Sequence, residues 1–74
     1  MNAKWRVVKQ ACEDHGLEVV MRGSEAVVKG AGREGKFRTQ VISHECCRSP
    51  NADVGADYIA ALRRKFGVRL PSGK

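Results

Sequence analysis

The sequence predicts an α+β fold, an α-β-β-β-α two-layer sandwich in which two helices pack on one face of a three-stranded antiparallel sheet. Two segments, one near each end of the chain, carry apolar residues at helical spacing. Between them lie three segments in which apolar and polar residues alternate, which is typical of strands with one covered face. Glycine-rich turns separate these segments, and the two-layer arrangement buries every apolar stripe.

Length and charge restrict the protein class. The 74 residues suit one small domain over residues 1–70, with 71–74 as a disordered tail. No apolar run approaches the roughly 20 residues of a membrane helix, and the N-terminus lacks the apolar core of a signal peptide, so we expect a cytoplasmic protein with no membrane anchor. The net charge of +6 favours nucleic acid, an acidic protein or an anionic surface as the partner.

The first helix is expected over residues 3–15. Asn2 is the predicted N-cap, and Trp5, Val8 and Cys12 follow at helical spacing. Gly16 is suited to the position just after the last turn, where a helix commonly ends in a left-handed residue.

Three strands are expected over residues 17–22, 25–29 and 36–43, joined by a Gly-Ser turn and by a glycine-rich loop at 30–35. The face turned toward the helices is predicted to carry Leu17, Val19, Met21, Ala26, Val28, Phe37, Thr39 and Val41. The exposed face is predicted to carry Glu18, Val20, Arg22, Glu25, Val27, Lys29, Lys36, Arg38, Gln40 and Ile42. This exposed face has no aromatic residue, so stacking of bases on the sheet is not expected.

The second helix is expected to begin after a polar loop at 44–52, with Asp53 as its N-cap and Gly67 just past its end. Its apolar stripe comprises Tyr58, Ile59, Leu62 and Phe66, and its last turn carries three cations. The predicted core is Trp5, Val8, Val19, Val28, Phe37, Val41, Ile59, Leu62 and Phe66.

Short motifs in this order resemble the HicA family, also called YcfA-like, the mRNA-cleaving toxins of bacterial toxin–antitoxin pairs. The matching motifs are Gly16-Leu17, Gly23-Ser24, Val41-Ile42-Ser43-His44 and Gly67-Val68. The resemblance covers about residues 3–70. It implies a fold like that of a double-stranded-RNA-binding domain, and it implies structured RNA as the ligand.

The chain departs from this family at the position of the catalytic histidine. Family members carry His directly after Gly-Ser, and this chain carries Glu25; Ile42 likewise stands where the family has Pro. Cleavage needs a group that takes and gives a proton near neutral pH, as imidazole does. A carboxylate flanked by Arg22 and Lys29 is held in its charged form and has no proton to give. We therefore expect binding without the family's usual catalysis.

Three functions follow from these residues. The first is RNA binding through phosphate and 2′-hydroxyl contacts by Arg22, Lys29, Lys36, Arg38, Arg63 and Arg64. The second is a protein-interaction module whose basic sheet face binds an acidic antitoxin-like partner. The third is an active ribonuclease that uses His44, the residue that matches the family's second histidine.

Cysteine and histidine side chains offer ligand types for zinc. Cys12 and His15 are three residues apart, and His44 lies close to the vicinal pair Cys46 and Cys47. Vicinal cysteines rarely share one tetrahedral site, and Cys12 belongs to the core stripe. We therefore expect free thiols, no metal and no cofactor, and an odd number of cysteines also argues against a disulfide framework.

Overall fold

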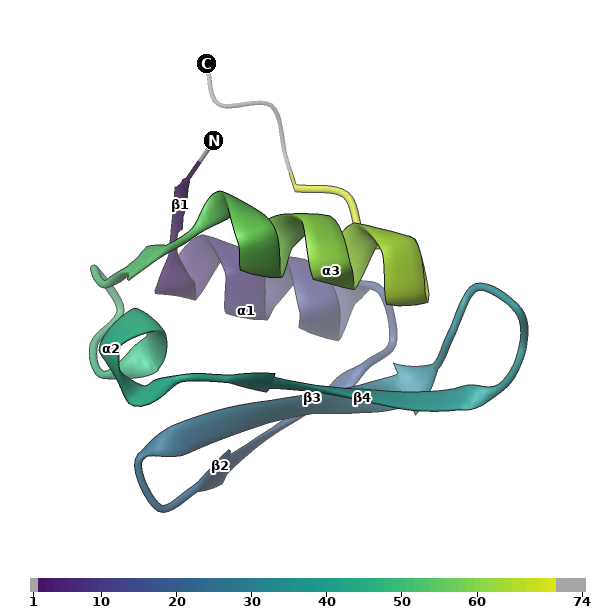
Figure 1. The fold of residues 1–74 in the computed structure, drawn as a ribbon, viewed down its shortest axis with the longest axis horizontal. Helices are drawn as coiled ribbons and strands as arrows, with labels where there is room; N and C mark the ends of the chain where they lie inside the picture. The colour runs from purple at the N-terminus through teal and green to yellow at the C-terminus, as the bar shows by residue number, and fades with distance from the viewer. Residues whose placement is uncertain (1, 71–74) are drawn as a thin grey trace.

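The computed structural model describes residues 2–70. It shows a small α+β protein with a three-stranded antiparallel sheet (Figure 1). Its elements are β1 (Ala3–Lys4), α1 (Trp5–Asp14), β2 (Glu18–Arg22), β3 (Glu25–Ala31), β4 (Phe37–Ile42), α2 (His44–Cys47), β5 (Asp53–Val54) and α3 (Ala56–Phe66). The predicted tail at 71–74 lies outside the described residues.

The sheet and the two long helices form the predicted two layers. The strand order is β2-β3-β4 with both pairs antiparallel, so β3 is central as expected. Helices α1 and α3 lie on the same side of the sheet, with α1 against β2 and α3 against β4 (Figure 1). The α+β two-layer architecture predicted from the sequence is therefore confirmed.

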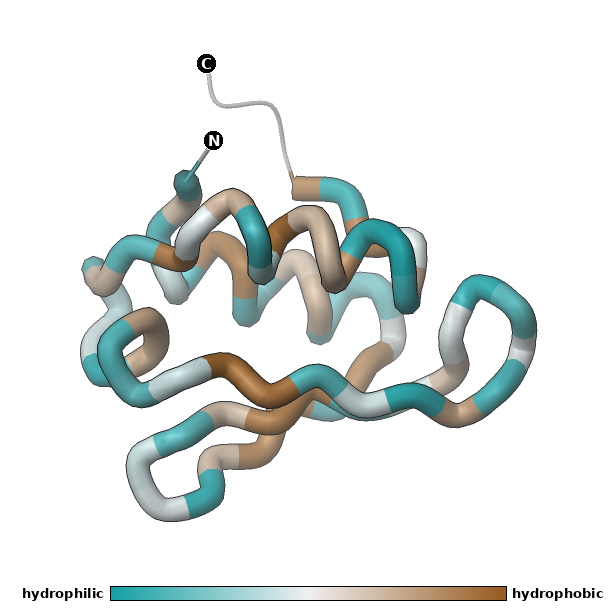
Figure 2. The backbone as a smooth tube through the Cα atoms, in the orientation of Figure 1, coloured by the Kyte–Doolittle hydropathy of each residue, from teal (hydrophilic) through white to brown (hydrophobic). Residues whose placement is uncertain are grey.

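The core lies between the helices and the sheet. Buried side chains follow the predicted stripe of α1, at Trp5, Val8 and Cys12, and they include Leu62 and Phe66 of α3. The apolar segments run through the middle of the strands and along the helices, while the ends of both hairpins are largely polar (Figure 2). The full buried set is Trp5, Val8, Cys12, Leu17, Ala26, Val28, Ile42, Cys47, Val54, Leu62, Phe66 and Val68.

Both long helices begin later than predicted. Residues before α1 pair with β5 instead of capping the helix, so the N-cap is Lys4 and not Asn2. The Trp5 N–H donates to the Ala52 carbonyl at 2.7 Å, which holds the start of α1 against the segment that leads into β5. Asp53 likewise lies in β5, where it accepts a hydrogen bond from Lys4 Nζ at 3.0 Å. Short-range capping patterns did not reveal this long-range pairing.

The segment expected as a polar loop contains one short helix. After Ser43 the chain turns into α2, four residues long, in which Cys47 is buried. The Ser43 N–H donates to the Tyr58 hydroxyl at 3.3 Å, which links the start of α2 to α3. This contact accounts for the half-buried position of Tyr58 within the predicted helical stripe.

The predicted orientation of the third strand is wrong. Ile42 is fully buried opposite Ala26, whereas Val41 is 45% exposed and Phe37 is 70% exposed. Because strand side chains alternate, Phe37, Thr39 and Val41 lie on the uncovered face. The end of this hairpin also extends beyond the helices (Figure 1). Of the other predicted core residues, Val19 and Ile59 are half-buried.

We call the side of the sheet away from the helices the open face. Register and alternation place on it Glu18, Val20, Arg22, Glu25, Val27, Lys29, Ala31, Phe37, Thr39 and Val41. It therefore carries an aromatic residue, contrary to prediction, and it lacks Arg38, which points to the helix side. Across residues 2–70, no helix is long and apolar enough to cross a membrane.

Candidate nucleic-acid interface

The loop between β3 and β4 docks on the C-terminal end of α3. The Arg33 N–H donates to the Lys65 carbonyl at 2.9 Å. In return, Lys65 Nζ donates to the Thr39 carbonyl at 3.2 Å. These reciprocal bonds hold a hairpin and a helix end together, although more than 25 residues separate Thr39 from Lys65 along the chain.

Gly32 makes this docking possible. A Cβ atom at this position would lie 2.7 Å from the Lys65 carbonyl oxygen and 2.8 Å from Arg38 Cγ. The Gly32 N–H also donates to the Lys36 carbonyl at 2.7 Å, which closes the loop. Only a residue without a side chain allows the two backbones to approach this closely.

Arg33 crosses the end of α3. Gly67 caps the helix in the left-handed conformation, with φ 78° and an N–H that donates to the Arg63 carbonyl. A Cβ atom on Gly67 would lie 3.2 Å from Arg33 Cγ, so the aliphatic part of Arg33 passes over this cap. A cation here is favoured by the negative end of the helix dipole.

Docking gathers cations from two distant segments at one place, which we call the basic corner. The loop contributes Arg33 and Lys36, β4 contributes Arg38, and the last turn of α3 contributes three cations. The basic corner is defined as Arg33, Lys36, Arg38, Arg63, Arg64 and Lys65. Glu34, in the same loop, accepts a hydrogen bond from Arg38 at 3.0 Å. Both partners are exposed, so this ion pair contributes little and leaves the corner strongly positive.

Four of the six predicted RNA-binding residues lie in the basic corner: Lys36, Arg38, Arg63 and Arg64. The other two do not. Arg22 ends β2 opposite Glu25, and Lys29 lies on the open face between Glu18 and Thr39. Arg33 and Lys65 also belong to the basic corner and were not predicted from the sequence. Gly32, directly before Arg33, was the available signal, because glycine permits close approach to another element.

His44 and Glu25, the two candidate catalytic residues, lie at the opposite end of the sheet. His44 begins α2, and its Nδ1 lies 3.1 Å from the carbonyl oxygen of Ser24, the residue before Glu25. When Nδ1 carries the hydrogen it donates to this carbonyl, and Nε2 is then an acceptor. Both side chains are exposed. The fold thus brings both candidate positions to one end of the sheet, and the basic corner lies at the other end.

The cysteines are free thiols, and two of them are buried. Burial raises the pKa of the Cys12 thiol to about 11, with a smaller contribution from the charge of Glu13. Burial also raises the pKa of Cys47, whose Sγ lies 3.3 Å from the Ser43 carbonyl oxygen. Among residues 2–70 no three His, Cys, Asp or Glu side chains are grouped to hold a metal ion.

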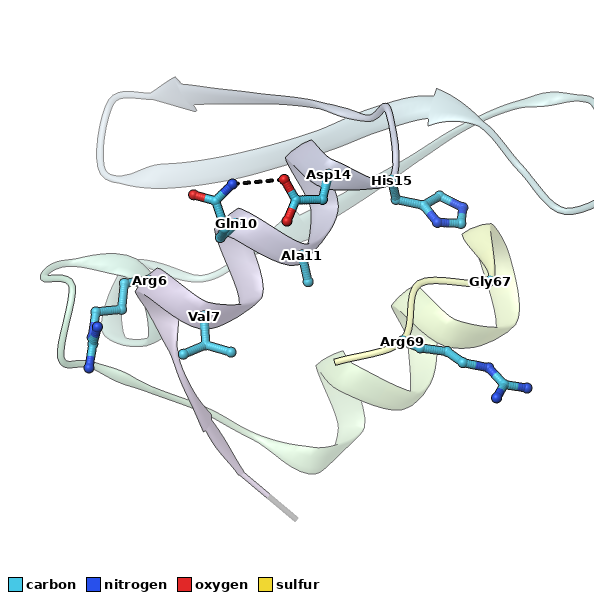
Figure 3. Close-up of a pocket in the computed structure, with 8 residues that line it drawn as sticks. All are labelled: Arg6, Val7, Gln10, Ala11, Asp14, His15, Gly67 and Arg69. Carbon is cyan, nitrogen blue, oxygen red and sulfur yellow. Dashed lines mark hydrogen bonds between the residues drawn. The ribbon is translucent and has the colours of Figure 1, made fainter. Parts of the chain in front are cut away.

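A cleft of about 770 Å³ lies between α1 and the segment after α3 (Figure 3). Its wall on α1 includes Gln10, which donates to Asp14 at 2.9 Å, and the exposed His15 (Figure 3). Arg6 and Arg69 line it from opposite sides, and Asp14 adds a carboxylate to the same lining. The cleft thus has two arginines, whereas the basic corner has six cations.

No protein-family model, curated protein or solved structure matches the chain.

Proposed function

We propose that the protein binds double-stranded or structured RNA through the basic corner and does not cleave it. The observation that carries this proposal is the docking of the β3–β4 loop on α3, which brings the six cations of the basic corner to one end of the molecule. Clustered Lys and Arg side chains neutralise phosphates and release counterions, which is the main source of affinity for a duplex. The resemblance to HicA toxins and to double-stranded-RNA-binding domains supports the same ligand.

The side-chain types of the basic corner favour a duplex over an unpaired strand. The six residues of the basic corner include no aromatic side chain, so they recognise phosphates and 2′-hydroxyls and do not stack on bases. Phe37 is 70% exposed, but it lies on the open face. Replacement of Phe37 by alanine is therefore expected to leave affinity for a perfect duplex unchanged, and a loss would indicate stacking on an unpaired base instead.

The test is a salt series on a short RNA duplex with two matched variants. Neutralisation of about five phosphates gives a log–log slope of affinity on salt near −4. Arg63→Ala removes a cation from the corner and is expected to weaken binding and to reduce the slope by about one. Arg22→Ala removes the same charge at the other end of the sheet and is expected to change affinity much less. No binding at low salt, or equal losses in both variants, would contradict the proposed interface.

An acidic antitoxin-like partner is less well supported as the ligand of the sheet. That hypothesis required a basic sheet face, and the open face instead carries Glu18 and Glu25 beside Arg22 and Lys29. The basic charge lies at the corner, where RNA is the better match.

A ribonuclease that uses His44 is the second candidate function. It is favoured by the contact of His44 Nδ1 with the Ser24 carbonyl, because a carbonyl acceptor orients the ring and leaves Nε2 free to accept a proton. The hydrogen bonds in the described part of the chain give this ring no carboxylate partner. The proposal of binding without cleavage therefore stands first, and the two functions are separated by the activity test at the end of the Discussion.

A further inference from the structure

The open face has a row of three valines across its middle. Val20 is directly opposite Val27, and Val27 is directly opposite Val41. Val41 is 45% exposed on the edge strand, and the other two are half-buried although no helix covers this side of the sheet. A continuous apolar row on an uncovered sheet is a typical protein-contact feature, because water contact with it is unfavourable.

Two charged rows flank the valines. On one side Glu18 faces Lys29, and on the other Arg22 faces Glu25. Each row pairs one acid with one base, so the open face is close to neutral in a protein whose net charge is +6. A neutral face has little attraction for RNA or for an acidic protein, and it suits a partner with the same balance of charges.

The two rows are related in a way that makes the face complementary to itself. Consider a second copy placed face to face and related by a two-fold axis that runs along the valine row. Val27 then meets the partner's Val27. Glu18 meets the partner's Arg22, and Lys29 meets the partner's Glu25. Every charge on the face thus meets its opposite, as an isologous interface requires.

A two-fold axis at right angles to the valine row gives the reverse result. An axis along β3 would place Lys29 against the partner's Lys29 and Glu25 against the partner's Glu25. Like charges would then meet at the centre of the contact, which opposes association. The order of residues on β2 and β3 therefore favours the first of these two arrangements.

We propose that two copies of this chain associate through their open faces, with the two-fold axis along the row Val20–Val27–Val41. The helices and the basic corner remain outside the contact, so the inference does not depend on RNA binding. Three strands about 4.8 Å apart and about 20 Å long offer a face on the order of 300 Å². This is well below a standard interface, so we expect a weak and transient dimer that forms only at high protein concentration.

The experiment exchanges the charges within one row at a time. One variant carries Glu18→Lys with Lys29→Glu, and the other carries Arg22→Glu with Glu25→Arg. Each keeps the net charge of the chain and keeps an acid opposite a base within its own sheet. In a homodimer of either variant, however, all four contacts between copies join like charges. We expect each variant alone to sediment as a monomer at concentrations where the parent is a dimer.

Mixing the two variants restores the attraction. In the mixed dimer, the exchanged row of one copy lies over the exchanged row of the other, and these two rows carry opposite charges at each contact. The two unexchanged rows also lie over each other, and their charges are opposite as in the parent. Sedimentation equilibrium of the equimolar mixture is expected to show a heterodimer with the parent's affinity. A parent that stays monomeric at 1 mM, or row variants that dimerise as the parent does, would overturn the proposal.

A single substitution gives a second test that does not disturb the paired rows. Val41→Lys adds a cation at an exposed position of an edge strand, where the fold tolerates it. Across the proposed axis this lysine meets the same lysine of the partner, so dimerisation is expected to be lost. Ser49→Lys adds the same charge at an exposed loop position away from the sheet and is expected to leave dimerisation unchanged. Circular dichroism confirms that each variant is folded, and equal dimerisation of both would contradict the inference.

Discussion

Ile42 and Ala26 lie directly opposite each other on β4 and β3, and both side chains are fully buried under the helices. This pair fixes which side of β4 faces the core. Val41, the next residue back, then points to the open face. The pair therefore separates two neighbouring apolar residues into one that stabilises the fold and one that is available for contact.

A matched pair of threonine substitutions tests this orientation. Ile42→Thr removes buried apolar atoms and places a hydroxyl in the core, so it is expected to lower the free energy of unfolding by about 2–4 kcal/mol. Val41→Thr keeps a β-branched residue at an exposed strand position and is expected to change it by less than about 0.5 kcal/mol. Urea denaturation at micromolar protein concentration measures both. The opposite order of effects would mean that β4 is turned the other way.

The orientation of β4 shows what the sequence does and does not determine. The apolar stripes that contain Trp5, Val8 and Leu62 predict the core correctly, because only one side of each helix can bury its whole stripe. In β4 the alternation is ambiguous, since Phe37 and Val41 outnumber Ile42. The register of β4 on β3 decides the matter, and a local pattern does not show that register.

Long-range contacts limited the prediction of the site in the same way. Arg63 and Arg64 stand out in the sequence as a run of cations. Arg33 joins them only because its N–H reaches the Lys65 carbonyl, and a contact between such distant residues has no local signature. The pairing of β1 with β5 displaced the predicted N-caps for the same physical reason.

The docking of the loop on α3 can be tested without removing any charge. Gly32→Val introduces a side chain where a Cβ would lie 2.7 Å from the Lys65 carbonyl oxygen. We expect the loop to leave the helix end, so that Arg33, Lys36 and Arg38 no longer act together with the cations of α3. Affinity for duplex RNA is expected to fall, and the salt slope to decrease by about one or two.

The control for this substitution is Gly55→Ala, because a Cβ at Gly55 meets no atom within 4 Å. It is expected to leave RNA affinity unchanged and to cost only a few tenths of a kcal/mol up to about 1 kcal/mol of stability at the N-cap. Unchanged RNA binding in Gly32→Val, with the same circular dichroism as the parent, would show that loop docking does not organise the interface.

The buried thiol of Cys12 predicts a loss of stability at high pH. Burial raises the pKa of Cys12 in the folded protein to about 11, whereas a thiol in the unfolded chain titrates near 8.5. Between these values the unfolded state has released its proton and the folded state has not. The unfolded state therefore binds fewer protons, and the free energy of unfolding decreases as pH rises, by at most about 3 kcal/mol.

The measurement is urea denaturation from pH 7 to pH 10.5 in parent and Cys12→Ala. The variant is less stable at pH 7 because it leaves a small cavity, but its stability is expected to decline less over this range. Thiol labelling supplies a second readout, in which the half-buried Cys46 is expected to react before Cys12 and Cys47. Parallel stability curves for parent and variant would refute the role of the Cys12 thiol.

The last prediction concerns Glu25, which stands where the resembled toxins carry histidine. We expect the parent to bind structured RNA without cleaving it, because an exposed carboxylate beside Arg22 has no proton to give to a leaving oxygen. Glu25→His places an imidazole at the same corner as His44, whose Nδ1 contacts the Ser24 carbonyl at 3.1 Å. Two imidazoles there are able to take and give a proton near neutral pH. A modest gain of RNA cleavage is therefore expected in Glu25→His, with RNA affinity little changed.

The companion variant is His44→Ala, made in the parent and in Glu25→His, with cleavage of a labelled RNA followed on gels. In the parent it is expected to change nothing, and in Glu25→His it is expected to reduce the new activity, since the second proton-transfer group is lost. A parent that cleaves RNA and loses this activity in His44→Ala would instead identify His44 as a catalytic residue and replace the binding proposal with the ribonuclease. If neither the parent nor Glu25→His cleaves or binds RNA, the resemblance to the toxins does not extend to function, and the basic corner must serve another anionic ligand.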